Sequence, residues 1–158
     1  MSELRNIEGE GRVTNARFAI LATRFNDAIV GRLVDGAVDR LRRQGVEAAD
    51  LHVVRVPGAW ELPLAADRLA ASGNYDGLVA LGCVIRGETA HFDYVCDTAN
   101  RGLDEVSRRH ALPLGFGVLT VENRSQAEAR AGGAKGNQGE DAAAAAAEMV
   151  NLLRRIKA

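Results

Sequence analysis

Long apolar runs are absent from this chain of 158 residues. The opening stretch, MSELRNIEGEGRVTNA, has no apolar core of the kind that a secretory signal carries. No later run approaches the roughly 20 apolar residues that a membrane-spanning helix needs. We therefore expect a cytoplasmic protein that has no membrane partner.

A large excess of charge of one sign is also absent, because 20 basic residues face 21 acidic ones and the formal net charge is −1. This balance gives no general electrostatic reason to bind nucleic acid, which requires basic surfaces. Small molecules and other protein chains are the partners that remain. With 47% hydrophobic residues, the chain can bury the core of one domain.

Cysteine is scarce. Cys83 and Cys96 are the only two, and no CxxC or HxxxH pair accompanies them, so we predict no metal site. A thiol nucleophile at Cys83 would need a neighbouring base, and the sequence singles out none. Cys96 falls on the predicted buried stripe of a helix, which consists of Phe92, Cys96, Ala99, Leu103 and Val106. Both cysteines are therefore predicted to be packing residues.

Four short apolar runs alternate with helix-length segments. The runs cover residues 17–24, 51–56, 77–85 and 113–121, and their near-continuous apolar character is typical of strands covered on both faces. The alternation predicts an α/β fold, a three-layer αβα sandwich with a four-stranded parallel sheet flanked by helices. We assign residues 14–158 to one domain, and residues 1–13 to a polar tail or to an arm that reaches a neighbour.

The predicted helices have their own start and stop signals and cover residues 27–44, 61–72, about 88–110 and 139–158. Gly45 and Gly73 follow the first two helices, and Pro63 lies in a first turn where its missing N–H does little harm. The first helix carries a predicted buried stripe of Val30, Val34, Ala37 and Leu41. The run of alanines from 142 to 147 is predicted to be plain helix rather than disorder.

Ligands of parallel α/β sheets bind at the carboxyl ends of the strands. The segments that follow such ends are 24–26, 56–61, 84–91 and the loop after residue 121. In the third segment, the backbone N–H groups of Gly87, Glu88 and Thr89 at a helix start could hold a phosphate. His91 lies off the buried stripe, where it could move protons at the same site or be an exposed structural residue.

Five motifs occur in a fixed order: RFN (24–26), VPGAWELP (56–63), GCVIRGETAHFDYVC (82–96), GFGVLTVEN (115–123) and RAGGAKGNQGEDAAAAAAEM (130–149). Together they resemble the lumazine synthase family of riboflavin biosynthesis, over nearly the whole chain after about residue 13. The resemblance implies a flavodoxin-like fold. It also implies an enzyme that condenses 5-amino-6-(D-ribitylamino)uracil with 3,4-dihydroxy-2-butanone 4-phosphate to give 6,7-dimethyl-8-ribityllumazine, without a metal or an organic cofactor.

The resemblance assigns roles to individual residues. Those expected to hold the pyrimidine and ribityl groups are Phe25, Asn26, Ala59, Trp60, Glu61, Val84, Ile85 and Phe116. Those expected to hold the phosphate are Gly87, Glu88, Thr89 and Arg130, whose planar guanidinium can grip two oxygens. His91 would be catalytic and would pass protons. From residue types alone, Phe25 could equally be a core residue, Asn26 only an N-cap, and Glu61 only a first-turn carboxylate.

Homo-oligomerisation is a further implication. In the family, the residues matching Phe116 and Arg130 reach the site from a neighbouring subunit of a pentamer. Family members occur as pentamers, decamers or icosahedral shells of 60 subunits, and we expect the shell. The apolar side chains of Met149, Leu153 and Ile156 on the last helix suit such association. Riboflavin synthase is the protein partner that the resemblance suggests.

One position departs from the family pattern. The family commonly has a lysine in its GNKG turn, where this chain has Gln138, and the nearest lysine is Lys135. Glutamine carries no charge, so we expect altered substrate affinity unless Lys135 compensates. Two other classes stay open, a flavodoxin-like carrier of FMN and an inactive shell or riboflavin-binding module. The joint presence of Phe25, Glu61, His91 and Arg130 favours the enzyme.

Overall fold

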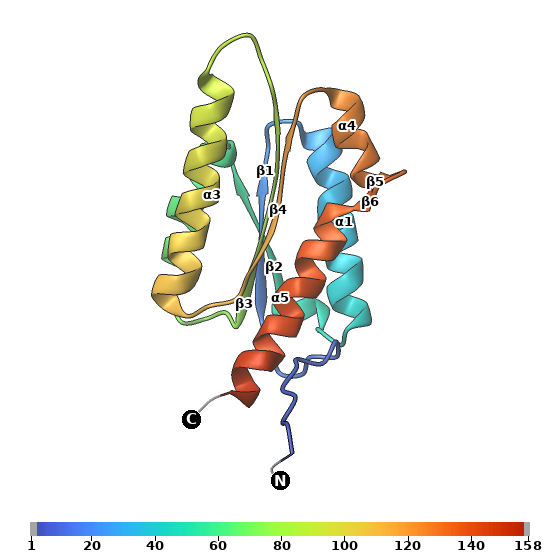
Figure 1. Cartoon of the computed structure of the whole chain (residues 1–158), viewed down its shortest axis with the longest axis vertical. Coiled ribbons are helices and arrows are strands. Elements are labelled where there is room, and N and C mark those ends of the chain that lie inside the picture. Colours follow the sequence, from blue (N-terminus) through green and yellow to red (C-terminus); the bar gives the residue numbers. More distant parts are fainter. Residues whose placement is uncertain (1–2, 157–158) are drawn as a thin grey trace.

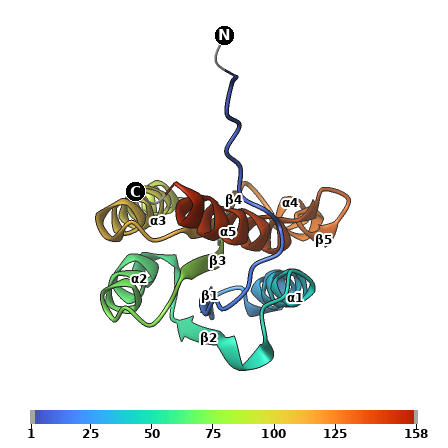
Figure 2. The same cartoon turned by 90° about the horizontal axis from the view of Figure 1, so that it is seen from below.

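A parallel four-stranded sheet forms the centre of the protein in a computed structural model that describes residues 3–156 (Figure 1). Its strands are β1 (Phe18–Thr23), β2 (Leu51–Val56), β3 (Gly77–Ile85) and β4 (Leu114–Val121), in the order β2-β1-β3-β4. Helices α1 (Asp27–Arg43) and α5 (Gln138–Arg155) cover one face, and α2 (Leu62–Ala71) and α3 (His91–His110) cover the other (Figure 2). The predicted three-layer α/β sandwich is confirmed.

The inner strands are buried on both faces, as predicted, because each carries an unbroken apolar sequence between two helical layers. The expectation of full burial is wrong for β2, in which His52, Val53 and Arg55 are exposed. β2 lies at the edge of the sheet, where only one neighbouring strand is present and the helices reach less far (Figure 2).

The ends of α1 and α2 lie close to the predicted positions. Gly45 adopts a φ of 104° directly after the C-cap of α1, and Gly73 adopts a φ of 72° after α2, a region that glycine enters without cost. The predicted stripe of α1, which ends at Leu41, is buried. A short 3₁₀ helix, η1 (Ala48–Asp50), leads into β2, and a second one, η2 (Ala59–Glu61), leads into α2.

The start of α3 differs from the prediction. The helix begins at His91 rather than near Glu88, so Gly87, Glu88 and Thr89 precede it as an exposed bend. The hydroxyl of Thr89 accepts a hydrogen bond from the His91 N–H at 3.3 Å. Threonine side chains often compete in this way with the backbone acceptors of a helix.

The region between β4 and α5 contains elements that were not predicted: α4 (Arg124–Ala129), β5 (Ala131–Gly133) and β6 (Gly136–Asn137). The Asn123 side chain caps α4 by accepting a hydrogen bond from the Gln126 N–H at 2.9 Å. β5 and β6 form an antiparallel hairpin that stands out beside α1 (Figure 1). In the same way, Asn137 caps α5 through the Glu140 N–H.

The alanine run is helical, as predicted, and it allows α5 to approach the sheet closely. A Cβ on Gly115 in β4 would lie 2.0 Å from the carbonyl oxygen of Ala142, so only glycine fits at this point of β4. Four alanines of α5 are buried, namely Ala142, Ala143, Ala146 and Ala147. Small side chains on both elements therefore set the short distance between this helix and the edge of the sheet.

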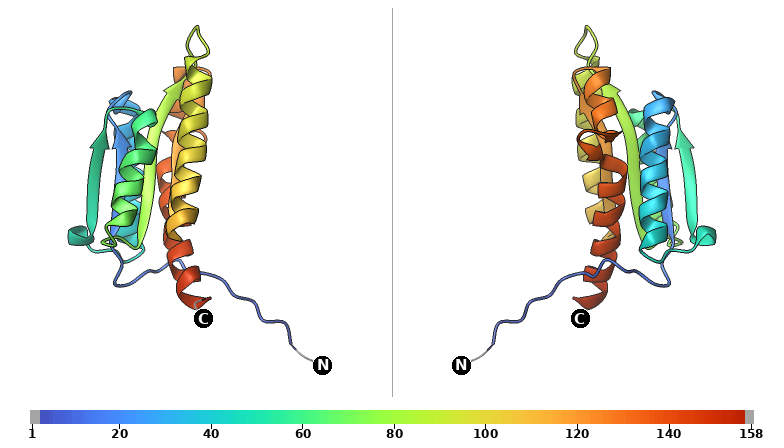
Figure 3. Two further views of the ribbon diagram at one scale, coloured as in Figure 1. Left: turned by 90° about the vertical axis from the view of Figure 1, so that its left-hand side faces the viewer. Right: turned by 90° about the vertical axis from the view of Figure 1, so that its right-hand side faces the viewer.

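The N-terminal segment runs as an extended chain away from the body of the protein (Figures 2 and 3). Near the end of α5, Arg155 Nη1 donates to the carbonyl of Glu8 at 2.9 Å and Asn151 Nδ2 donates to that of Glu10 at 2.6 Å. The outermost residues of the predicted tail and last helix, 1–2 and 157–158, lie outside the described part. Over residues 3–156, no helix has the length and hydropathy needed to cross a membrane.

Candidate active site

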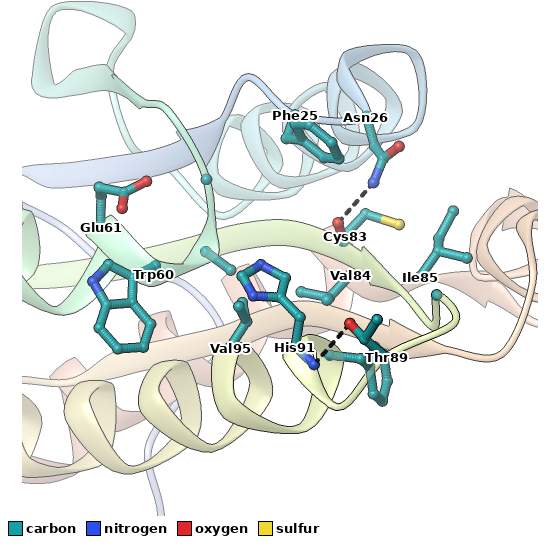
Figure 4. Close-up of a pocket in the computed structure, with 14 residues that line it drawn as sticks. Phe25, Asn26, Trp60, Glu61, Cys83, Val84, Ile85, Thr89, His91 and Val95 are labelled. Atoms are coloured by element: carbon teal, nitrogen blue, oxygen red, sulfur yellow. Dashed lines mark hydrogen bonds between the residues drawn. The ribbon is translucent and has the colours of Figure 1, made fainter.

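A pocket of about 520 Å³ lies at the carboxyl end of the sheet, between the ends of β1 and β3, η2 and the start of α3 (Figure 4). Most of the predicted site residues line it, namely Phe25, Asn26, Ala59, Trp60, Glu61, Val84, Ile85, Gly87, Thr89 and His91. The rule that ligands of parallel sheets bind at strand ends pointed to this region, and a pocket is present there. The binding roles of these residues stay predictions.

The turn after β1 presents Phe25 and Asn26 to the pocket. The Phe25 side chain is 72% exposed, so the alternative of a core phenylalanine is wrong for this chain. Asn26 adopts a left-handed conformation with φ 60° and ψ 44°, which asparagine tolerates better than most residues. It occupies the N-cap position of α1, yet its side chain makes no capping hydrogen bond there.

β3 extends beyond β1, which leaves a free strand edge at the pocket. Pairing with β1 ends at Leu81, whereas pairing with β4 continues to Ile85. On the free side, the Cys83 carbonyl accepts a hydrogen bond from Asn26 Nδ2 at 2.9 Å (Figure 4). Peptide groups alternate in direction along a strand, so those of Ile85 face the same side as those of Cys83. A flat ring could bind along this edge as a further strand would.

The segment after β2 supplies the opposite wall of the pocket. η2 places Ala59 inside and leaves Trp60 and Glu61 at the opening, where Figure 4 shows both at one side of the pocket. Glu61 precedes α2, but its carboxylate makes no capping hydrogen bond to that helix. The carboxylate is therefore not used in capping α2 and can accept hydrogen bonds from a ligand.

His91 is the first residue of α3, and its ring lies near the middle of the pocket, between the Trp60 side and the Val84 side (Figure 4). The residue is exposed, so the ring can contact a ligand. Within residues 3–156, no hydrogen bond from the backbone N–H groups of Gly87, Glu88 or Thr89 is observed. Gly87 and Thr89 line the pocket, whereas Glu88 does not. These N–H groups can donate hydrogen bonds to an anion, although they precede the helix.

Several predicted site residues lie away from this pocket within the chain. Phe116 borders a separate pocket of about 230 Å³ beside α3. Arg130 is the C-cap of α4, and its Nη1 donates to the Gln126 carbonyl at 3.0 Å. Lys135 lies exposed between β5 and β6, and Gln138 begins α5. Figure 1 shows α4 and the hairpin on the opposite side of the sheet from α3.

Four lining residues were not predicted as site residues, namely Gly58, Cys83, Phe92 and Val95.

The prediction that Cys96 belongs to the buried stripe of α3 is wrong, because Val95 is buried in its place and Cys96 is half-buried. Residues three and four positions after Phe92 both fit a helical stripe, so the sequence pattern alone could not separate them. The spacing of Phe92 and Val95, three positions apart on one face of α3, is the sequence signal that could have identified this wall of the pocket.

Neither cysteine has the character of a nucleophile. Burial raises the pKa of Cys83 to about 11, and the positive charge of Arg124 lowers it only in part. Burial and the neighbouring Asp93 carboxylate also raise the pKa of Cys96. Both thiols are therefore protonated near neutral pH.

Over residues 3–156, no group of three or more His, Cys, Asp or Glu side chains has an arrangement that could hold a metal ion.

The chain is similar to known proteins over nearly its whole length. The family model described as 6,7-dimethyl-8-ribityllumazine synthase matches residues 15–154. The chain is 48% identical over 156 residues to the 6,7-dimethyl-8-ribityllumazine synthase of Desulfovibrio desulfuricans, covering 99% of this chain and 100% of that relative. It is 49% identical over 156 residues, with the same coverage, to the protein of that name from Nitratidesulfovibrio vulgaris strain DP4.

Proposed function

The chain belongs to the 6,7-dimethyl-8-ribityllumazine synthase family, and we propose that the pocket around His91 is the site of that family's reaction. The protein is a transferase of riboflavin biosynthesis. It condenses 5-amino-6-(D-ribitylamino)uracil with 3,4-dihydroxy-2-butanone 4-phosphate to 6,7-dimethyl-8-ribityllumazine, with release of phosphate and water. The observation that carries the assignment of the pocket is that the segments after β1, β2 and β3 meet around the His91 ring.

The pyrimidine substrate would bind between Phe25 and the free edge of β3. The exposed Phe25 ring offers an offset stacking surface, which is worth about 1 kcal/mol beyond burial. The backbone groups of Ile85 would read the polar edge of the ring. The ribityl chain would extend toward Trp60 and Glu61, since a polyol needs fixed acceptors of the kind that a free carboxylate provides.

The phosphorylated substrate would bind at the bend before α3. The open N–H groups of Gly87 and Thr89 support this assignment, because they line the pocket and point to no acceptor among residues 3–156. Arg130 would add a planar cation from a neighbouring subunit. Glu88, which lies outside the pocket, would direct its carboxylate into solvent.

His91 would transfer the protons that the reaction requires. Imine formation, phosphate elimination and ring closure each move a proton at a near-neutral group, and imidazole titrates in that range. No nucleophilic thiol is needed, in keeping with the raised pKa of Cys83. Much of the rate would come from holding two substrates together, which can lower a barrier by about 7–11 kcal/mol.

The working form would be a homopentamer whose sites are shared between subunits. Support comes from the place of Phe116 and Arg130, which lie away from the pocket within one chain but belong to the predicted site. Exposed apolar side chains such as Leu64 and Tyr94 would be covered by such contacts. The extended residues 3–12 would serve as an arm onto a neighbour.

Twelve pentamers would form a shell of 60 subunits in the cytoplasm, with riboflavin synthase as its candidate partner. Light scattering on the purified protein tests this assembly. Particles of pentamer size alone would contradict the shell, and a monomeric active enzyme would contradict the shared site.

The reaction itself is tested by mixing the purified protein with both substrates and following lumazine absorbance together with phosphate release. We expect the two products to appear in equal amounts, and neither to form when one substrate is left out. A yellow protein that binds FMN and forms no lumazine would instead favour a carrier with the same layered fold.

A further inference from the structure

Arg86 joins three elements at the base of the bend that precedes α3. Its backbone N–H donates to the Val121 carbonyl at 2.9 Å, so the pairing of β3 with β4 continues one residue further. Its Nε donates to Glu122 Oε2 at 2.8 Å, directly after β4. Its Nη1 lies 3.5 Å from Asp93 Oδ1, in the first turn of α3. One side chain therefore connects the ends of β3 and β4 with the start of α3.

The guanidinium of Arg86 also lies over an aromatic ring of the pocket wall. Its central carbon is 4.4 Å from the centroid of Phe92, a distance typical of a cation–π contact. Phe92 is buried and lines the pocket, and it follows His91 directly in the chain. The contact therefore fixes the first turn of α3 both by charge and by packing.

The bend that precedes α3 has few contacts that hold it in place. Residues 86–90 are exposed, and a Cβ on Gly87 would meet no atom within 4 Å. The hydrogen bond from the His91 N–H to the Thr89 hydroxyl lies within the segment itself and does not tie it to the sheet. The orientation of His91 therefore depends on the contacts that Arg86 makes with the first turn of α3.

We propose that Arg86 is a positioning residue for the condensation, and that it acts by holding the first turn of α3, and with it the ring of His91, against the end of β4. This inference rests on the proposed role of His91. A displacement of about 1 Å in a reacting geometry can cost about 10²-fold in rate. The ion pairs of Arg86 are partly exposed, so their effect on global stability is small.

The test is a set of variants in which the effect of Arg86 is measured with and without His91. Arg86→Met keeps an unbranched side chain of about the length of the aliphatic part of arginine and removes the charged guanidinium. Arg101→Met is the control, since Arg101 lies on α3, pairs only with Asp97 in the described chain, and has a side chain that is 83% exposed. Steady-state kcat and KM for each substrate are measured in the oligomeric protein, and thermal unfolding is recorded alongside.

We expect Arg86→Met to lower kcat about 10- to 100-fold, with less than about threefold change in KM for either substrate. In the His91→Ala background, the same substitution should change kcat less than about twofold, because residues that act through one another are not additive. Glu122→Gln should lower kcat by a smaller factor, and Arg86→Lys should restore part of the rate. Arg101→Met should leave kcat unchanged.

Three results would overturn the inference. A loss of kcat that is equally large in the His91→Ala background would show that Arg86 acts without His91. An unchanged kcat with a raised KM for the butanone phosphate would make Arg86 a direct contact of the phosphate. Unchanged kinetics in Arg86→Met, in a preparation whose wild type forms lumazine, would remove this inference alone, whereas an inactive wild type would remove the proposed function with it.

Discussion

The Cys83 thiol should react very slowly although it lines the pocket. Burial raises its pKa to about 11 from an ordinary value of 9.0. At pH 8, a thiol with a pKa of 9 is about one-tenth thiolate, whereas a thiol with a pKa of 11 is about one-thousandth thiolate. Alkylation proceeds through the thiolate, so we expect iodoacetamide to modify Cys83 about a hundredfold more slowly than an ordinary thiol.

The measurement is best made in a Cys96→Ala variant, which leaves a single thiol. Alkylation is followed by mass spectrometry from pH 7 to pH 10, and the same protein unfolded in urea provides the reference thiol. In the folded protein the rate should rise about tenfold per pH unit through pH 10 without levelling off. The unfolded protein should level off near pH 9.

A folded-state rate equal to that of the unfolded chain, or one that levels off below pH 9, would refute the reasoning. It would mean that the pKa of Cys83 is not raised in the folded protein, and a nucleophilic role of this thiol would be open again. As a functional companion, a folded Cys83→Ala, Cys96→Ala variant should keep most of the lumazine-forming activity.

Three further predictions concern turnover, affinity and stability. His91→Ala should slow lumazine formation by no more than the roughly 10²–10⁴-fold that positioned proton transfer supplies, and a folded but wholly inactive variant would contradict the role of proximity. Gln138→Lys should lower KM for the phosphorylated substrate by a few-fold and leave kcat unchanged, as steady-state kinetics will show. In α1, Gly36→Ala should destabilise the protein, since its Cβ would lie 2.6 Å from the Asn137 side chain that caps α5. Gly31→Ala, whose Cβ meets nothing within 4 Å, should stabilise it by up to about 1 kcal/mol in urea unfolding at the same protein concentration.

The sheet and its order of elements were largely predictable from the sequence. β1 and β3 combine continuous apolar runs with flanking turn residues, and a buried parallel strand requires that pattern. The exposure of β2 was not predictable, because its run resembles the others, and what distinguishes it is an edge position without the helix cover that the other edge strand, β4, receives. The apolar pattern shows which residues a strand could bury. The neighbouring strands and helices decide which of those residues are buried in the fold.

The pocket was predictable in position but not in all of its detail. The loops at the strand ends held Phe25, Glu61 and His91, as the strand-end rule requires. The predicted start of α3 was wrong because the side-chain hydroxyl of Thr89 competes with the backbone acceptors of the helix. The contact of Arg86 with Glu122 was beyond sequence reasoning, since the two residues lie 36 positions apart and meet only through the pairing of β3 with β4.

Trp60 is the only tryptophan of the chain, and it lies 55% exposed at the opening of the pocket. The protein thus carries a single indole fluorophore, and this indole lies beside the site where the ribityl group would bind. A ligand that covers the indole will change its emission, and no other indole dilutes the signal. Occupancy can then be measured optically in unlabelled protein, separately from turnover, even in variants that bind substrate and do not convert it.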